Sequence, residues 1–200
     1  MDLTPAAPLP GPCLAALFTD AHTAYRFTDA PVSDEQVADA YRLARMAPTS
    51  MNCQPLRIAL IRSPGARAAL LPMLAEGNRA KAASAAVIAV LAADTDFPHH
   101  LPRLAPHLPD AAAGFTDPAA RESFALANAR LQAGYFILAL RAVGLDVGPM
   151  GGFNAAAVTE SVLAATSWRA FLVVNIGHAA EDGTRPRAPR LEPAEVMWTI

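Results

Sequence analysis

The chain has 200 residues, of which 53% are hydrophobic and 17% are charged, and this composition is typical of one globular domain with a substantial core. Its formal net charge of −2 excludes the strongly basic surface that holds nucleic acids or anionic membranes, so small molecules and other proteins are the expected partners. We expect a single domain over residues 1–200, with residues 1–13 as a flexible, proline-rich lead-in.

Three features of the chain bear on its compartment. The longest apolar run, Ala82 to Ala93, is shorter than the roughly 20 residues that cross a bilayer. Residues 1–18 lack a cationic start and are interrupted by prolines, which argues against a secretory signal. Cys13 and Cys53 have no metal-ligand spacing and are too few for a disulfide scaffold. The reduced cytoplasm is therefore the expected location.

The first half of the chain shows helix and strand patterns in turn. Ser33 and Gln36 form a capping box that predicts a helix from there to about Met46. Pro48 ends this helix, and the following segment, PTSMNCQP, is not predicted to be regular. Residues 56–60, LRIAL, alternate large apolar side chains with other residues, which predicts a strand with one buried face.

The next part of the chain is predicted to contain a helix, a central strand and a long loop. Ser63-Pro64 predicts a helix start, with serine as the cap and proline in the first helical position. Residues 87–92 are apolar without alternation, as expected for a strand covered on both faces. Residues 97–116 are rich in proline and histidine and lack periodicity, so we expect a long, ordered, lid-like loop.

The second half begins with the longest predicted helix, from Asp117-Pro118 to Gly144. A bare-backbone segment LDVGPMGGF, a helix capped by Asn154 and a strand at residues 170–177 follow, and the tail TRPRAPRLEP is too rich in proline for a helix. Because the strands are few and the connecting loops polar, the order favours an α+β fold with helices around one sheet.

The common nucleotide and hydrolase fingerprints are absent from the sequence. Polar or bare-backbone residues instead gather in four segments: Thr49, Ser50, Asn52 and Gln54; Asn78 and Lys81; Gly148 to Gly152; and Arg185, Arg187 and Arg190. Together they match the needs of a flat cofactor with a phosphate tail. An amide both donates and accepts along a pyrimidine edge, glycine lets the backbone approach a ring, and arginine suits phosphate. Lysine is a compact charge for the N1–C2=O side of a reduced flavin.

Four segments, in order and spacing, resemble the FMN-dependent nitroreductase family: PTSMNCQP, GN-x-x-K, GLDVGPMGGF and RAPRL. DAPVSDE, LPRLAPH and the C-terminal tail further resemble its malonic semialdehyde reductase (RutE-like) branch, and the similarity runs from about Leu14 to Leu191. The resemblance implies an α+β fold with a central, mostly antiparallel sheet surrounded by helices. It also implies an obligate homodimer with FMN in two interface sites, each taking residues from both subunits.

The resemblance also implies a set of cofactor-binding residues, carried over position by position: His22, Thr23, Tyr25, Pro48, Thr49, Ser50, Asn52, Asn78, Lys81, Pro149, Met150, Gly151, Gly152, Arg187 and Arg190. Asn78 would address the pyrimidine edge, Lys81 the N1/O2 side, and the Gly151 amide the hydride-carrying N5. Arg187 or Arg190 would hold the phosphate. Many family members have Arg-x-Ser-x-Arg/Lys near the N-terminus, whereas this chain has AHTAYRF, with Arg26 as the alternative in a shifted register.

The implied activity is oxidation of NADPH or NADH through flavin N5, in two half-reactions, with malonic semialdehyde reduced to 3-hydroxypropanoate. The Gly151 amide and Lys81 would support hydride transfer, without a required side-chain acid. A carboxylate-bearing acceptor would need a cation, for which Arg26, Arg103 and Arg121 are candidates. The alternatives are a broad nitroaromatic or quinone reductase and a flavin-binding protein without turnover. No metal site is predicted, because the spacing of the histidines in residues 97–116 fits no standard motif.

Overall fold

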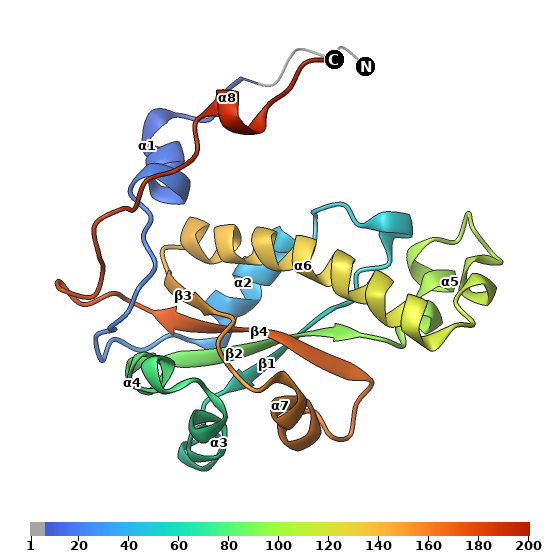
Figure 1. Cartoon of the computed structure of the whole chain (residues 1–200), viewed down its shortest axis with the longest axis horizontal. Helices are drawn as coiled ribbons and strands as arrows, with labels where there is room; N and C mark the ends of the chain where they lie inside the picture. The colour runs from blue at the N-terminus through green and yellow to red at the C-terminus, as the bar shows by residue number, and fades with distance from the viewer. Residues whose placement is uncertain (1–6) are drawn as a thin grey trace.

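An antiparallel sheet forms the centre of the computed structural model, in which residues 7–200 are described (Figure 1). Its strand order is β1-β2-β4-β3. The strands are β1 (Leu56–Ile61), β2 (Val87–Asp94), β3 (Asp146–Met150) and β4 (Trp168–Gly177). Every pairing between these strands is antiparallel, and helices cover both faces of the sheet, so the expected α+β class is confirmed.

Helices connect and cover the strands. The α-helices are α1 (Gly11–Leu14), α2 (Asp34–Ala44), α3 (Pro64–Leu70), α4 (Glu76–Ser84), α5 (Leu101–Leu104), α6 (Pro118–Ala142), α7 (Ala155–Val162) and α8 (Pro193–Val196). A π-helical turn spans Ala15–Thr19, and 3₁₀ turns span Ser50–Asn52, Leu71–Met73, Phe97–His100 and Ala111–Gly114.

Side-chain caps start the helices where the sequence predicts. Ser33 and Gln36 make both hydrogen bonds of the capping box, at 2.9 and 3.1 Å, and α2 ends at Ala44, slightly before the predicted Met46. The side chains of Ser63, Asp117 and Asn154 accept from backbone N–H groups in the first turns of α3, α6 and α7. These caps satisfy N–H groups that have no partner within the helix.

Two hydrophobic layers lie on opposite faces of the sheet. Along β2, Val87, Ala89 and Leu91 pack with α2 and α6, whereas Ile88 and Val90 pack with α3, α4 and α7. All of β2 is buried, which confirms the strand covered on both faces. Successive side chains of β2 therefore point to opposite faces of the sheet, although the sequence of this strand is uniformly apolar.

The structure differs from the sequence-based expectation at β1. Leu56, Ile58 and Leu60 share the face that packs on the layer of α2 and α6, as the alternation predicts, but only Leu56 of these three is buried and the residues from Arg57 to Leu60 are half-buried. β1 is an edge strand whose outer side borders an open groove next to α2, and this position leaves Ile58 and Leu60 partly accessible.

Strand β3 was not expected from the sequence. Asp146–Met150 pairs with β4 although it contains Gly148 and Pro149. Proline is tolerated here because β3 is the last strand of the sheet, and among the described residues its outer side makes only an isolated bridge, from Val147 to Thr23. Gly148 is required by a close approach, since a Cβ there would lie 2.5 Å from the carbonyl oxygen of Ala24.

The expected lead-in and lid-like loop both contain short helices. Residues 1–6 lie outside the described part of the chain, and α1 begins at Gly11. Residues 97–116 include α5 and two 3₁₀ turns, anchored by an aromatic cluster in which Phe97 stacks on Phe124 and meets Phe115 edge-on. This aromatic cluster supplies a core that the sequence periodicity does not reveal.

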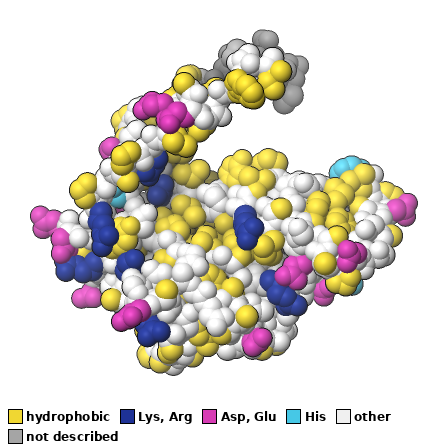
Figure 2. Space-filling view, viewed as in Figure 1, with side chains coloured by type: hydrophobic (Ala, Val, Ile, Leu, Met, Phe, Trp, Pro, Cys, Tyr) yellow, Lys and Arg dark blue, Asp and Glu magenta, His cyan; other side chains and the backbone are white. Residues whose placement is uncertain are grey.

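The C-terminal tail, residues 191–200, projects away from the sheet (Figure 1). It includes α8 and carries exposed apolar side chains, among them Met197 at 73% and Trp198 at 92% exposure. Figure 2 shows hydrophobic side chains along the projecting segments. Across residues 7–200, no helix has the length and hydropathy needed to traverse a bilayer.

Candidate functional site

A chain of polar contacts links α4 to the end of β3. The Asn78 amide donates to the carbonyl oxygen of Gly152 at 3.0 Å, and Lys81 Nζ donates to Asn78 Oδ1 at 3.2 Å. Lys81 Nζ also lies 4.7 Å from the centre of the Tyr25 ring, a cation–π distance. Asn78 and Lys81 therefore share one face of α4, as their spacing of three residues requires.

The glycine pair after β3 leaves the backbone accessible. Gly151 and Gly152 are exposed, and a Cβ on Gly152 would lie 2.8 Å from Asn78 Nδ2. A larger residue at Gly152 would therefore push the Asn78 amide aside. Pro149 is half-buried and the Met150 side chain is buried in the core, so Met150 can offer a ligand its backbone only.

A basic pocket adjoins Tyr25, where Lys and Arg side chains gather below the projecting segments (Figure 2). This arginine pocket has a volume of about 450 Å³ and is lined by Phe18, Ala21, His22, Thr23, Tyr25, Arg141, Arg185, Pro186, Arg187, Ala188 and Arg190. None of these lining residues is acidic. The Arg185 guanidinium lies 4.6 Å from the centre of the Tyr25 ring, so Tyr25 joins the pocket to Lys81.

Backbone contacts fix the walls of the arginine pocket. Arg187 Nη2 donates to the carbonyl oxygens of Phe18, Thr19 and Ala21, at 2.8 to 3.1 Å. His22 Nδ1 lies 3.0 Å from the carbonyl oxygen of Arg185, to which it can donate. Arg190 Nη1 donates to the carbonyl oxygens of Ala188 and Pro189, just before it in the chain. Arg187 thus ties the C-terminal segment to residues 18–21.

The segment Thr49–Gln54 is held in an unusual backbone shape. Met51, Asn52 and Gln54 have φ angles of 52°, 51° and 40°, in the left-handed region that residues other than glycine seldom adopt. Asn52 Nδ2 donates to the carbonyl oxygen of Leu104 in α5, and Asn52 Oδ1 accepts from Gln54 Nε2. Such strain persists only where surrounding contacts enforce it, and it concentrates at functional sites.

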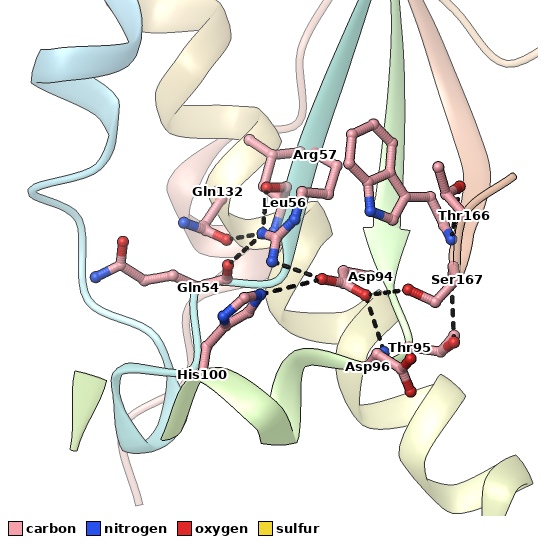
Figure 3. A network of polar contacts seen from close by, with 11 residues as sticks. Gln54, Leu56, Arg57, Asp94, Thr95, Asp96, His100, Gln132, Thr166 and Ser167 are labelled. Carbon is pink, nitrogen blue, oxygen red and sulfur yellow. Dashed lines mark hydrogen bonds and ion pairs between the residues drawn. The ribbon is translucent and has the colours of Figure 1, made fainter. Parts of the chain in front are cut away.

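A buried carboxylate anchors this segment (Figure 3). Asp94 has a side chain only 5% exposed, and its Oδ2 lies 2.5 Å from Arg57 Nη2, while its Oδ1 accepts from Ser167 Oγ at 2.6 Å. Arg57 Nη1 donates to the carbonyl oxygen of Gln54 at 3.0 Å. His100 Nε2 lies 3.6 Å from Asp94 Oδ2. The end of β2 therefore holds Gln54 through Arg57 and lies next to His100, in the first turn of residues 97–116.

An open groove of about 1010 Å³ runs along β1 between α2 and α5. Its lining includes Asn52, Gln54, His100 and Arg103, together with apolar side chains of α2 and β1. Of the three cations considered for an acceptor carboxylate, the exposed Arg103 is the one that lines this groove. Arg26 instead pairs with Asp182, and Arg121 Nε is buried without a hydrogen-bond partner in the described part of the chain.

The predicted site residues fall into two groups at opposite ends of the sheet. α4 leads into the start of β2, and its group includes Tyr25, Gly152 and the arginine pocket. Thr49–Gln54 leads into β1, whose Leu56 pairs with Ala93 at the far end of β2. Figure 1 shows the segment before β1 next to α5, away from α4. One chain therefore does not bring Thr49, Ser50 and Asn52 to Asn78 and Lys81.

Arg141 is a pocket residue that sequence reasoning missed. It lies in the last turn of α6, lines the arginine pocket and donates from Nη1 to the carbonyl oxygen of Leu17 at 3.1 Å. Burial lowers its pKa, the positive charge of Arg187 lowers it further, and Asp146 partly offsets the shift. Arginine is common near helix C-termini, so nothing in the sequence distinguished it.

Cys53 and the histidines of residues 97–116 are two further candidate groups. Cys53 is buried, and burial raises the pKa of its thiol. Within residues 7–200, no cluster of three or more His, Cys, Asp or Glu side chains has a metal-binding arrangement. His99 and His100 lie in a 3₁₀ turn, and His107 is exposed.

A family profile, sequence relatives and solved structures all relate this chain to nitroreductases. The profile of the nitroreductase family matches residues 19–178. A relative from Leptothrix cholodnii, provisionally named an NADH dehydrogenase/NAD(P)H nitroreductase, is 52% identical over 180 residues, covering 90% of this chain and 91% of the relative. Among solved structures, a Bacillus subtilis protein provisionally named a nitroreductase superposes with a TM-score of 0.83 at 20% identity, covering 94% of this chain and 98% of that one. A protein from Exiguobacterium sibiricum, also provisionally named a nitroreductase and solved in complex with FMN, has a TM-score of 0.80 at 19% identity, covering 98% of this chain and 100% of that one.

Proposed function

The chain belongs to the nitroreductase family, and on that premise we propose that it is an FMN-dependent NAD(P)H oxidoreductase. The observation that carries the proposal is the continuous line of groups from Gly152 through Asn78, Lys81 and Tyr25 to the arginine pocket. Such a line suits a ligand that is planar at one end and anionic at the other. The FMN in the Exiguobacterium sibiricum structure supports the same assignment.

Each group in this line has a chemical role in the proposal. Bound FMN would supply reversible hydride transfer between NAD(P)H and the acceptor. Asn78 would hydrogen-bond the pyrimidine edge, and Lys81 would place a positive charge next to it. The exposed Gly151 N–H would donate to N5, the hydride-carrying atom. Arg187, with Arg190 nearby, would hold the phosphate.

We propose that the functional unit is a homodimer with composite sites. In one chain, Thr49, Ser50 and Asn52 lie at the opposite end of the sheet from Asn78 and Lys81. A second copy could bring the missing group to each site. The exposed apolar side chains of the C-terminal tail support this assembly, because an apolar surface of that kind is typical of a protein interface.

For the acceptor, we propose malonic semialdehyde, reduced to 3-hydroxypropanoate. The sequence features that support it are DAPVSDE and LPRLAPH, the second of which supplies Arg103. Arg103 lines the groove near Asn52 and Gln54 and could hold the acceptor's carboxylate. The cytoplasm, where NAD(P)H is available, remains the expected compartment.

A broad nitroaromatic or quinone reductase is the second candidate, and the name of the Leptothrix cholodnii relative favours it. Such an enzyme would need only a flat apolar slot over the flavin. The kcat/KM values for malonic semialdehyde and for a nitroaromatic, each with NADPH, separate the two. A preference for the nitroaromatic by orders of magnitude would overturn malonic semialdehyde as the acceptor.

The cofactor itself is tested by absorbance. We expect the purified protein to be yellow and its flavin absorbance to bleach when NADPH or NADH is added without oxygen. A protein that binds FMN but does not bleach with either nucleotide would be a flavin-binding protein without turnover. A colourless protein that takes up no added FMN would contradict the proposed function altogether.

A further inference from the structure

Only some of the guanidinium N–H groups in the arginine pocket are used in hydrogen bonds to its walls. Arg141, Arg185, Arg187 and Arg190 line it, and the lining residues include no carboxylate. Arg187 uses Nη2 for three carbonyl oxygens, and Arg141 uses Nη1 for one, so both guanidinium groups are fixed by the fold. Each retains N–H donors with no protein partner among the hydrogen bonds of the described residues.

We propose that Arg141, on the last turn of α6, is a direct ligand of the flavin phosphate and binds it together with Arg187. This inference rests on the proposed function and adds to it a residue that comes from the core helix of the fold rather than from either terminal segment. Because α6 packs against the sheet and α2, Arg141 would set the position of the phosphate relative to the rigid body of the protein.

The charges around Arg141 support an anion with two negative charges. Arg187 repels the Arg141 guanidinium, and the depressed pKa of Arg141 reflects burial first and this repulsion second. Asp146 raises the pKa of Arg141, but by less than either of these two effects lowers it. A phosphate monoester between Arg141 and Arg187 would offset both the burial of the Arg141 charge and its repulsion by Arg187. The planar guanidinium can donate two hydrogen bonds to such a phosphate.

The pocket's position next to Tyr25 and Lys81 favours the flavin phosphate as its anion. Tyr25 lies between the Arg185 guanidinium and Lys81 Nζ, at 4.6 and 4.7 Å from its ring centre. The pocket therefore continues into the groups proposed to hold the flavin ring. The 2′-phosphate of NADPH has the same chemistry, so the kcat/KM values for NADPH and NADH are measured for the same variants as the flavin affinities.

The test compares FMN with riboflavin, which lacks the phosphate. Dissociation constants of both flavins are measured by fluorescence for the wild type, Arg141→Met, Arg141→Lys and the control Arg42→Met. Arg42 is an exposed α2 residue that pairs with Glu35 and Asp39 and does not line the pocket, so its loss removes one positive charge outside the pocket. We expect Arg141→Met to weaken FMN binding on the order of 10- to 100-fold, since hydrogen bonds to a charged group are lost, with riboflavin binding unchanged. Arg141→Lys should give an intermediate loss, and Arg42→Met none.

Other outcomes separate this inference from the proposed function. If the wild type binds neither flavin, the proposed function fails. If the wild type prefers FMN strongly and Arg141→Met, or Arg141→Lys where the first does not fold, keeps the same FMN-to-riboflavin ratio, Arg141 is not a phosphate ligand and the function stands. A changed preference for NADPH over NADH with an unchanged FMN-to-riboflavin ratio would assign Arg141 to the nucleotide instead and overturn the inference.

Discussion

Lys81 is the single lysine of a chain whose other basic residues are all arginines, and its surroundings favour a compact charge. Its Nζ fits between Asn78 Oδ1 and the Tyr25 ring. We predict that Lys81→Arg lowers flavin affinity roughly tenfold, because the larger planar guanidinium would displace Asn78 or the ligand edge. Flavin titration by fluorescence measures the change.

The matched control for Lys81 is the exposed Arg79 on the same helix. Arg79→Lys makes the reverse exchange and should leave flavin affinity unchanged. If Lys81→Arg and Arg79→Lys both bind flavin as the wild type does, the lysine has no special role.

Cys53 provides a prediction on pH. Burial raises the pKa of its thiol in the folded protein above the value of about 8.5 for a free thiol, so the folded state holds this proton more tightly than the unfolded state. The resulting stability is present below the unfolded pKa and is lost as the pH rises through the folded pKa. In a Cys13→Ser background, we expect Cys53 to resist a thiol reagent at pH 8 until denaturant is added. Rapid labelling of the native protein would show that Cys53 is accessible.

At the scale of single elements, local sequence rules predicted where helices begin more accurately than how strands are buried and paired. The caps at Ser33, Ser63, Asp117 and Asn154 are short-range contacts, and each predicted its helix correctly. The burial of β1 and the pairing of β3 depend instead on which strands are edges, which the spacing of side chains does not encode. For the same reason Arg141 was missed, since only the three-dimensional fold places the end of α6 next to residues 185–190.

The buried Asp94 joins β2 to two other elements, so its removal should be costly. Asp94→Ala would leave Arg57, whose side chain is 21% exposed, without its carboxylate, and Ser167 Oγ without its acceptor. We predict a loss of about 2–4 kcal/mol in the free energy of unfolding, because breaking a largely buried ion pair leaves a charge unpaired. Urea denaturation measures it.

A comparison variant distinguishes this ion pair from an ordinary surface pair. Asp39→Ala removes an exposed partner of Arg42 and should cost less than about 1 kcal/mol. Equal losses for Asp94→Ala and Asp39→Ala would show that the network in Figure 3 contributes no more than a surface pair.

For the whole molecule, the C-terminal tail should decide the oligomeric state. We predict that the proposed homodimer becomes a monomer when residues 192–200, which contain the exposed Val196, Met197, Trp198 and Ile200, are removed. Loss of apolar contact area is the physical reason. Sedimentation velocity over a range of concentrations measures the state, and Thr199→Ala is the control. A truncated protein that stays dimeric would place the interface elsewhere.

The division of the site residues between the two ends of the sheet leads to a complementation prediction. If α4 of one copy meets Thr49–Gln54 of the other, Lys81→Glu and Asn52→Ala damage different halves of the same site. In a mixed dimer, one site then carries both changes and the other carries neither. Co-refolding equal amounts of the two variants should restore roughly a quarter of the FMN sites, because half of the randomly paired dimers are mixed and each has one intact site. The double variant Lys81→Glu/Asn52→Ala, refolded with itself, should restore none. Recovery absent from the mixture, with mixed dimers confirmed by mass spectrometry, would mean that each flavin site is built from a single chain.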